Sequence, residues 1–149
     1  MRLTLHTDYA LRMLIYMATR PDGLCTVSDV AEAYGLSRNH LLKVAQTLRD
    51  IGLVETTRGR AGGIRLAKAP EAIGIGALVR ATEEAFPLAE CMQAEGGNCC
   101  AISPACRLKG MLHEALAAFL AALDRYTLAD IVRNRAELGP LLGLGAVAA

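Results

Sequence analysis

The order of hydrophobic and polar positions along the chain predicts a series of short helices. In six segments, apolar residues recur every three or four positions, which is the spacing of one buried helix face. These segments are residues 4–19, 27–34, 38–50, 73–84, 104–123 and 128–134. The Gly-, Ala- and Leu-rich tail from Gly139 onward is expected to be poorly ordered. We therefore expect a mostly α chain.

Capping side chains mark where the first and the longest of these helices begin. Thr7 or Asp8 can cap the first helix, and Asp8 lies one turn before Arg12, so the two can form an ion pair. Ser103 and Pro104 predict the start of the longest helix, with serine as the N-cap and proline at the first helical position. The apolar stripe of that helix is longer than a small domain can bury, so we expect a partner subunit to cover it.

The second and third helices predict a helix-turn-helix motif. They are joined by a short turn at Gly35, and Ser37 is placed to cap the second of the pair. This helix is expected to bury one apolar side and to expose Arg and Asn near its N-terminus, which can pair with guanine and adenine. The residues expected to be buried are Leu41, Leu42, Ala45 and Leu48. An exposed polar face can also be only a solvated face, so the residues that follow this helix decide between the two interpretations.

A basic, Gly-rich hairpin follows directly. Two short strands are expected over residues 51–54 and 64–66, and the stretch between them has the composition of the wing of a winged helix. Glycine lets the backbone approach phosphate, and arginine supplies positive charge. The candidate DNA-binding residues are Ser37, Arg38, Asn39, His40, Lys43, Arg58, Arg60, Gly62 and Gly63.

The distribution of charge supports this interpretation. The 149 residues carry a net charge of only +1, but residues 37–68 hold seven Lys or Arg against two Asp or Glu. A phosphate-facing surface concentrates basic charge in this way. No apolar run is long enough to cross a membrane, no signal peptide is evident and the cysteine count of five is odd. We expect a cytoplasmic protein in a reducing environment, without disulfide bonds.

Four of the five cysteines lie in residues 89–109, at positions Cys91, Cys99, Cys100 and Cys106. Structural zinc sites usually present closely paired cysteines, whereas these wide intervals suit a polynuclear cluster, and soft thiolates favour iron–sulfur chemistry. The adjacent Cys99 and Cys100 point in different directions, so at most one is expected to be a ligand. This leaves three thiolates and a missing fourth ligand. The alternatives are a zinc site and a reduced loop without metal.

Over nearly its whole length the chain resembles the bacterial family of winged-helix repressors with iron–sulfur clusters, whose members include NsrR, IscR and RirA. The stretches MRLTLHTDYALRMLIYMA, SRNHLLKV, RGRAGGIRL, CAISPACRLK and YTLADIV carry the resemblance. Of these, HTDYALR, SRNHLLKV and SPACRLK are most similar to the NsrR type, which senses nitric oxide. The resemblance implies a homodimer with crossed long helices, in which each winged helix reads half of a palindromic operator.

The resemblance also implies the ligands of a cluster, expected to be [4Fe-4S], with [2Fe-2S] as the alternative. Cys91, Cys100 and Cys106 match the family's ligand cysteines, although the longer loop before Cys100 leaves Cys99 as a possible substitute. The fourth ligand of NsrR-like proteins matches Asp8, supplied by the partner subunit, with Arg12 beside it. IscR-like proteins use a histidine at the position that is Lys109 here, so the chain departs from the IscR pattern.

The expected function is that of a repressor and not of an enzyme. Reaction of the cluster with nitric oxide would release the operator and derepress genes for nitric oxide detoxification. One alternative is a repressor that responds to iron or iron–sulfur status, as RirA or IscR does. A more distant alternative is a thiol redox protein, although no Cys-x-x-Cys pair is present. Residues 1–80 are expected to form the winged helix-turn-helix domain, and residues 81–149 the cysteine loop and dimerisation helix.

Overall fold

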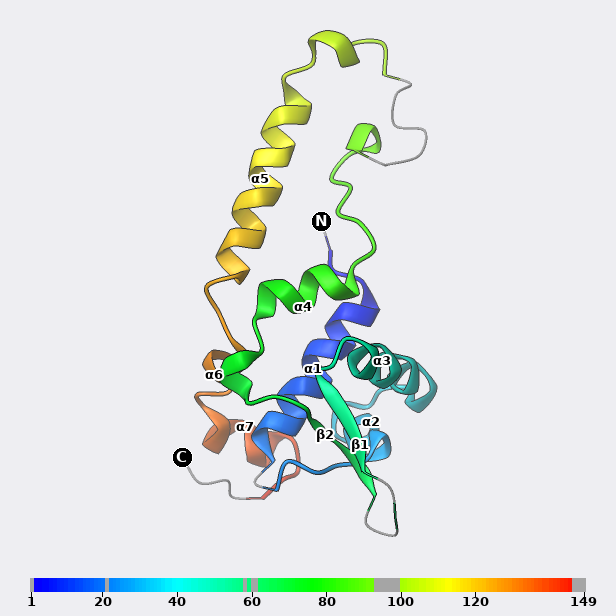
Figure 1. The fold of residues 1–149 in the computed structure, drawn as a ribbon, viewed down its shortest axis with the longest axis vertical. Coiled ribbons are helices and arrows are strands. Elements are labelled where there is room, and N and C mark those ends of the chain that lie inside the picture. The colour runs from blue at the N-terminus through cyan, green and yellow to red at the C-terminus, as the bar shows by residue number, and fades with distance from the viewer. Residues whose placement is uncertain (1, 21, 58, 60–61, 93–99, 146–149) are drawn as a thin grey trace.

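The computed structural model describes residues 2–20, 22–57, 59, 62–92 and 100–145. These residues form a helical body with one antiparallel hairpin and a long protruding helix (Figure 1), so the expected fold class is confirmed. The helices are α1 (Leu5–Thr19), α2 (Val27–Tyr34), α3 (Arg38–Asp50), α4 (Ile75–Thr82), α5 (Leu108–Leu123), α6 (Leu128–Ile131) and α7 (Arg135–Leu141). The strands are β1 (Val54–Thr57) and β2 (Gly63–Leu66), and short 3-10 turns cover Pro70–Ala72, Glu90–Met92 and Ser103–Ala105.

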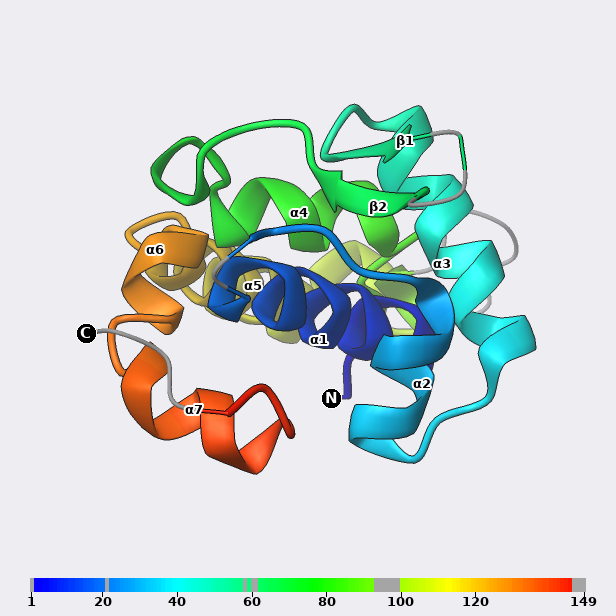
Figure 2. The same ribbon diagram turned by 90° about the horizontal axis from the view of Figure 1, so that it is seen from below.

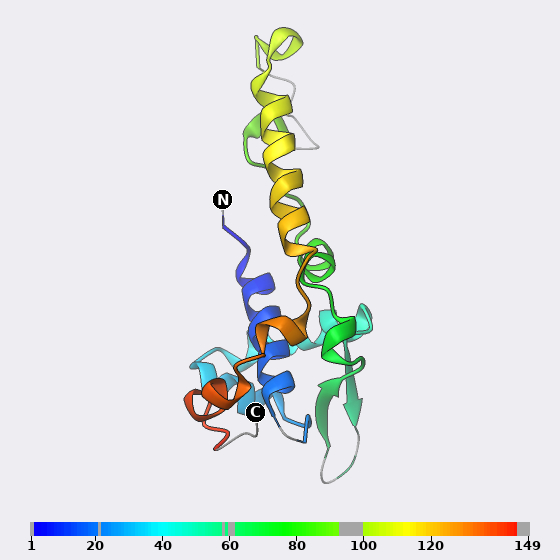
Figure 3. The same ribbon diagram turned by 90° about the vertical axis from the view of Figure 1, so that its left-hand side faces the viewer.

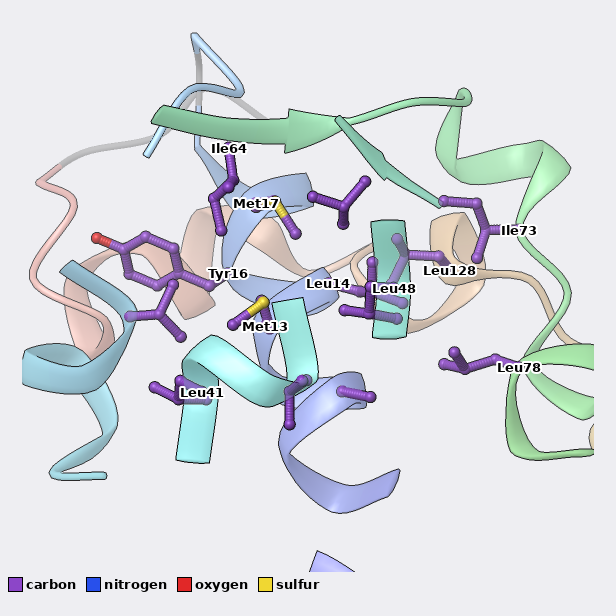
Figure 4. Close-up of a cluster of buried hydrophobic side chains, with 14 of the residues drawn as sticks. Met13, Leu14, Tyr16, Met17, Leu41, Leu48, Ile64, Ile73, Leu78 and Leu128 are labelled. Atoms are coloured by element: carbon purple, nitrogen blue, oxygen red, sulfur yellow. The ribbon is translucent and has the colours of Figure 1, made fainter. Parts of the chain in front are cut away.

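Helix α1 is the centre of the body. It contacts α3, α4, α6, α7 and β2 (Figure 2), so it collects the apolar faces of elements from both ends of the sequence. Met13, Leu14 and Met17 of α1 are almost completely buried against Leu41 and Leu48 of α3 and the rest of the core cluster (Figure 4). Burial of such side chains stabilises the fold by about 1.5–3 kcal/mol each.

The start of α1 differs from the prediction by a few residues. Thr4 is the N-cap, and its side chain accepts a hydrogen bond from the Thr7 backbone N–H. Thr7 and Asp8 therefore lie inside the first two turns, and their assignment as caps was wrong. Thr7 is instead fully buried, and its hydroxyl donates to Thr82 of α4. The cap shifted because Thr7 has a tertiary partner, which local sequence does not reveal.

The helix-turn-helix has the predicted bounds. Thr26 and Asp29 form a reciprocal capping box at the start of α2, and Gly35 ends it with a positive φ of 64°, a conformation that glycine adopts without strain. Two details of α3 were wrong. Ser37 occupies the N-cap position without a side-chain cap bond, and Leu42 is 42% exposed, while Val44 faces the core.

The wing hairpin begins later than predicted. Residues 51–53 form the turn that ends α3, because Gly52 adopts φ 71°, and β1 starts only at Val54. Val54 pairs with Leu66 and Thr57 with Gly63 in an antiparallel register. Of the two strands, Val54 and Ile64 supply the side chains that are buried in the core. The hairpin is therefore anchored at its base, while Thr56, Thr57 and Gly59 are exposed.

The segment between α4 and α6 forms an arm (Figure 1), whereas α4, α6 and α7 all contact α1 in the body. Helix α5 stands away from the body in two perpendicular views (Figures 1 and 3). It begins at Leu108, so the prediction that Ser103 and Pro104 start it was wrong. That pair starts a separate 3-10 turn, and Cys106 follows in an extended conformation that interrupts the helical path.

The C-terminal segment is more ordered than predicted. Thr127 caps α6 with a capping box, but α6 ends at Ile131, before the predicted end at residue 134, and a further helix, α7, follows. Pro140 lies inside α7, and Leu138 and Leu142 pack against the core. The expectation of a poorly ordered tail from Gly139 was therefore wrong for the residues up to Gly145, because tertiary packing stabilises a segment with weak local signals. No helix in the described part of the chain is long and apolar enough to span a membrane.

Candidate nucleic-acid interface and metal centre

The outer face of α3 carries the polar side chains predicted to contact DNA. Arg38, Asn39, His40 and Lys43 are all exposed, while Leu41, Val44 and Leu48 on the opposite side are buried. Burial of the apolar side fixes the rotation of the helix about its axis. The first two turns of α3 therefore face solvent in the way that a recognition helix requires.

Two of these candidate residues also have partners inside the protein. The Arg38 Nε donates a hydrogen bond to Ser28 Oγ at 3.0 Å, which connects the start of α3 to α2. The His40 ring lies 6.4 Å from the Tyr9 ring, centroid to centroid, which connects the same turn to α1. These contacts orient the N-terminal turn of α3, whereas Asn39 and Lys43 extend from it as exposed side chains.

A groove of about 330 Å³ lies between α2, α3 and the hairpin. Its polar lining residues are Thr26, Ser28, Arg38, Gln46, Arg49 and Thr56. Gln46 and Arg49 were not among the candidates, although their spacing from Arg38 and Leu42 places them on the same helix face. Gln46 donates to Asp50 at 2.7 Å and accepts a hydrogen bond from Arg49. The exposed polar face of α3 therefore continues to its last turn.

Two wing glycines among the candidate residues, Gly62 and Gly63, are required by packing. A Cβ atom at Gly63 would lie 2.5 Å from the Cys25 carbonyl oxygen, and one at Gly62 would lie 2.6 Å from the Thr57 carbonyl oxygen. Their small size lets the hairpin close and pack on the chain before α2. Arg58 and Arg60 lie outside the described residues. Their predicted role in DNA binding stays a prediction.

The cysteine loop lies at the far end of the arm. Cys91 is in the 3-10 turn Glu90–Met92 and Cys106 follows Ser103–Ala105; both are half-buried, and Cys100 is exposed. All three are free thiols. Within the described residues, no three His, Cys, Asp or Glu side chains are gathered in a way that could hold a metal ion. Cys99 lies outside those residues.

The donor chemistry of this loop nevertheless fits an iron–sulfur cluster. Three unpaired thiols on one loop supply soft ligands, which are the donors that such clusters use. The fifth cysteine has a different environment: burial raises the pKa of Cys25 to about 12, so its thiol stays protonated. Cys25 is 3% exposed and acts as a small apolar core residue.

Asp8 and Arg12 form the predicted ion pair on α1. Arg12 Nη2 lies 2.9 Å from Asp8 Oδ2, and Arg12 Nε donates to Asp8 Oδ1 at 3.1 Å. The same guanidinium lies 5.8 Å above the centre of the Tyr34 ring at the end of α2. Both side chains of the pair remain about 40% exposed. One cation thus connects Asp8 to the helix-turn-helix.

The arm exposes a row of apolar side chains. Leu108 is 56% exposed, Met111 63% and the nearby Ile102 64%, and no residue of α5 is buried. Leu120 and Leu123, at the end of α5 nearest the body, do pack against the core. The rest of the stripe has the character of an uncovered interface.

Comparison with known proteins places this arrangement in a family. The family model Rrf2, described as an iron-dependent transcriptional regulator, matches residues 3–134. The chain is 54% identical over 145 residues to the HTH-type transcriptional regulator NsrR of Halalkalibacterium halodurans, covering 97% of this chain and 99% of that one. It is 52% identical over 143 residues to the NsrR of Bacillus subtilis, covering 95% and 97%.

A solved structure shows the same fold. IscR of T. potens superposes with a TM-score of 0.71 at 24% identity, covering 93% of this chain and 90% of that chain. The resemblance to NsrR-type regulators is confirmed by the relatives. Since the family model spans most of the chain and the relatives match it almost end to end, this chain belongs to the Rrf2 family and is a DNA-binding transcriptional regulator, not an enzyme.

Proposed function

We propose that the chain is a homodimeric repressor whose iron–sulfur cluster senses nitric oxide and thereby controls operator binding. The observation that carries this proposal is the chain of contacts from Asp8 through Arg12 to Tyr34. It joins the residue expected to complete the cluster directly to the DNA-binding motif. The NsrR relatives and the three free thiols support the same conclusion.

The exposed face of α5 supports a dimer. Leu108 and Met111 are the most exposed large apolar side chains of this helix, and Leu112 and Leu116 continue the same stripe. A second copy of α5 offers an apolar stripe of the same shape, as a two-fold interface requires. On α1, Leu5 is 59% exposed one turn before Asp8, so this part of α1 also offers a surface for the partner's cysteine loop.

Cys91, Cys100 and Cys106 of one subunit would hold the cluster together with Asp8 of the other. When bound, the cluster supplies iron that reacts with nitric oxide. An oxygen ligand is weaker than a thiolate and is easier to displace. The role of this chain's residues is to connect the Asp8 ligand to DNA binding. The expected location of the protein is the cytoplasm.

The connection runs through Arg12. In the free chain, Arg12 holds both carboxylate oxygens of Asp8. If Asp8 binds iron, at least one of these contacts weakens, and the guanidinium is free to shift over the Tyr34 ring. Tyr9, the neighbour of Asp8, contacts His40 in the first turn of α3. Two side-chain contacts thus couple the Asp8 turn to the two helices of the DNA-binding motif.

The experiment is a nitric oxide titration of anaerobically purified protein, with visible absorbance and operator binding followed in the same samples. We expect the broad iron–sulfur absorbance and the operator affinity to fall together at a few nitric oxide molecules per cluster. A colourless protein that binds zinc, or a cluster protein that keeps its operator under nitric oxide, would overturn the proposal.

Variants assign the ligands in the same assay. Cys106→Ala should abolish both the iron–sulfur absorbance and the response of operator binding to nitric oxide. Cys25→Ala should keep both, because Cys25 is a core residue. Asp8→Ala should retain DNA binding but make the cluster less stable. Equal cluster loading in Cys106→Ala and wild-type protein would exclude the proposed ligand set.

A second function has one observation in its favour. The matching family is described as iron-dependent, so a repressor that responds to iron status is the alternative. Iron chelation of the cluster protein, in the absence of nitric oxide, separates the two. Release of DNA on chelation, by a protein that keeps its DNA under nitric oxide in the titration above, would support the iron-status function.

A further inference from the structure

A bidentate ion pair connects the C-terminal end of α5 to α4. Arg80 Nη1 and Nη2 donate to Asp124 Oδ1 and Oδ2 at 2.6 and 2.7 Å. The backbone adds to this connection, because the Ile75 N–H donates to the Tyr126 carbonyl at 2.9 Å. A bidentate pair of this kind fixes direction as well as distance. The chain therefore turns from arm to body at a defined joint.

Gly76 makes room for this joint. A Cβ atom at position 76 would lie 2.0 Å from Asp124 Oδ1 and 3.0 Å from Arg80 Nη1. The carboxylate thus rests directly on the backbone of α4. Glycine inside a helix is normally unfavourable relative to alanine. Its presence here is explained by the space that the ion pair occupies.

The rest of α5 has little other contact with the body. Leu120 and Leu123 pack against the core, but the turns from Leu108 to Phe119 extend outward (Figure 3). The helix has 16 residues, so it is about 24 Å long. A rotation of about 10° at its base would move its far end by about 4 Å. The angle at the joint therefore controls where the arm points.

We infer that Arg80 and Asp124 are positioning residues that set the angle between the dimerisation arm and the winged helix, and with it the spacing of the two recognition helices on DNA. This inference rests on the proposed dimer through α5. Each winged helix would be attached to the dimer axis through one such joint. The fixed angle would make the dimer selective for one separation of operator half-sites.

Stability alone does not explain the pair. The side chains of Arg80 and Asp124 are 43% and 46% exposed, and ion pairs at this exposure contribute little to folding. The Arg80 hydrogen bonds hold the pKa of Asp124 below its ordinary value, so the pair stays charged at neutral pH. What the pair provides is a fixed geometry between two helices.

The test measures spacing preference. DNA bound by the wild-type dimer is first selected from a random pool, and base pairs are then inserted or deleted at its centre. One extra base pair turns the half-sites by about 34° and separates them by about 3.4 Å. We expect the wild type to lose about tenfold or more in affinity, whereas Asp124→Ala loses about threefold or less.

Gly76→Ala is the second variant. The new methyl group would displace the Asp124 carboxylate while favouring the α4 helix, so the joint is loosened without loss of helix stability. It should relax spacing preference as Asp124→Ala does. Arg133→Ala is the matched control, because it removes another Arg–Asp pair, at 2.6 Å, between an exposed arginine that follows α6 and Asp130 of α6. The control should keep the wild-type preference.

Sedimentation of each protein separates failure of the proposed dimer from failure of the proposed role of Arg80 and Asp124. A monomeric wild-type protein would overturn the proposed dimer and this inference with it. If the wild type and both variants are dimers with the same spacing preference, the inference alone is wrong. Dimeric variants with relaxed spacing, and unchanged affinity for a single half-site, are the expected result.

Discussion

The Thr7 hydroxyl donates a hydrogen bond to Thr82 Oγ1 at 2.8 Å, at a point where both side chains are buried. Thr82 in turn donates to the Leu78 carbonyl at 3.0 Å, one turn earlier in α4. Next to this contact, Glu83 accepts hydrogen bonds from the backbone and side chain of Thr4. These bonds fix the start of α1, which carries Asp8, against the end of α4, which leads to the cysteine loop.

The effects of losing the two partners in this pair should not add, because loss of either one leaves the other without its hydrogen bond. Thr82→Val leaves the buried Thr7 hydroxyl without its acceptor, so we expect the free energy of unfolding to fall by about 1–3 kcal/mol. The double variant, with valine at both positions, should be less destabilised than the sum of the single variants. Urea unfolding provides the measurement. Thr57→Val, on the exposed wing, is the control and should change stability by less than about 0.5 kcal/mol.

Cys25 should make the protein less stable in alkali. Burial raises the pKa of its thiol from 9.0 to about 12, so the folded state keeps the proton after the unfolded chain has lost it. The stabilisation is complete below pH 9 and is lost as the pH rises toward 12. The slope from this one group is at most about 1.4 kcal/mol per pH unit.

The measurement is urea unfolding of reduced, metal-free protein between pH 9 and pH 10. Cys25→Ala should show a flatter decline of stability with pH than the wild type, whatever its stability at neutral pH. Tyr16 and Tyr34 also have raised pKa values, but their ordinary value is 10.0, so they contribute mainly above this window. Parallel slopes for the two proteins would show that Cys25 does not titrate in this way.

Local signals explain which parts of the fold were predictable. The bounds of α2 and α3 follow from the Thr26–Asp29 capping box and from Gly35, and all of these act within one turn of sequence. Non-local packing decided the rest. The Thr7 contact with α4, the exposure of Leu42 toward the groove and the ordering of α7 depend on residues far away in the chain.

The candidate site divides in the same way. The Asp8–Arg12 pair follows from helical spacing, and the exposed face of α3 follows from its periodicity. The groove that Gln46 and Arg49 line depends on the position of the hairpin, which only the fold supplies. The assembly of Cys91, Cys100 and Cys106 with an acidic ligand stays a prediction, because it depends on a second subunit.

A charge on the apolar face of α5 should prevent dimerisation. Met111 is 63% exposed on this face, and a glutamate there would be buried without a partner in the proposed dimer. We expect Met111→Glu to sediment as a monomer and to bind a full operator at least about tenfold more weakly. Ala117→Glu places the same charge on another side of the exposed helix and should remain dimeric. A dimeric Met111→Glu protein would place the interface elsewhere.

Asn39 and Lys43 should affect DNA binding in different ways. Asn39 is in the first turn of α3, where a recognition helix contacts base edges, and its amide can pair with adenine. Asn39→Ala should therefore reduce affinity for the selected operator by about 1–3 kcal/mol and relax the preference at one base pair.

Lys43, one turn later, carries a mobile point charge suited to phosphate. Lys43→Ala should weaken binding to all sequences and reduce the slope of log affinity against log salt by about 1. Fluorescence anisotropy over a salt series, with Arg133→Ala, just after α6, as a charge control, separates the two effects. A uniform loss in Asn39→Ala, or an unchanged salt slope in Lys43→Ala, would mean that α3 docks on DNA with a different face.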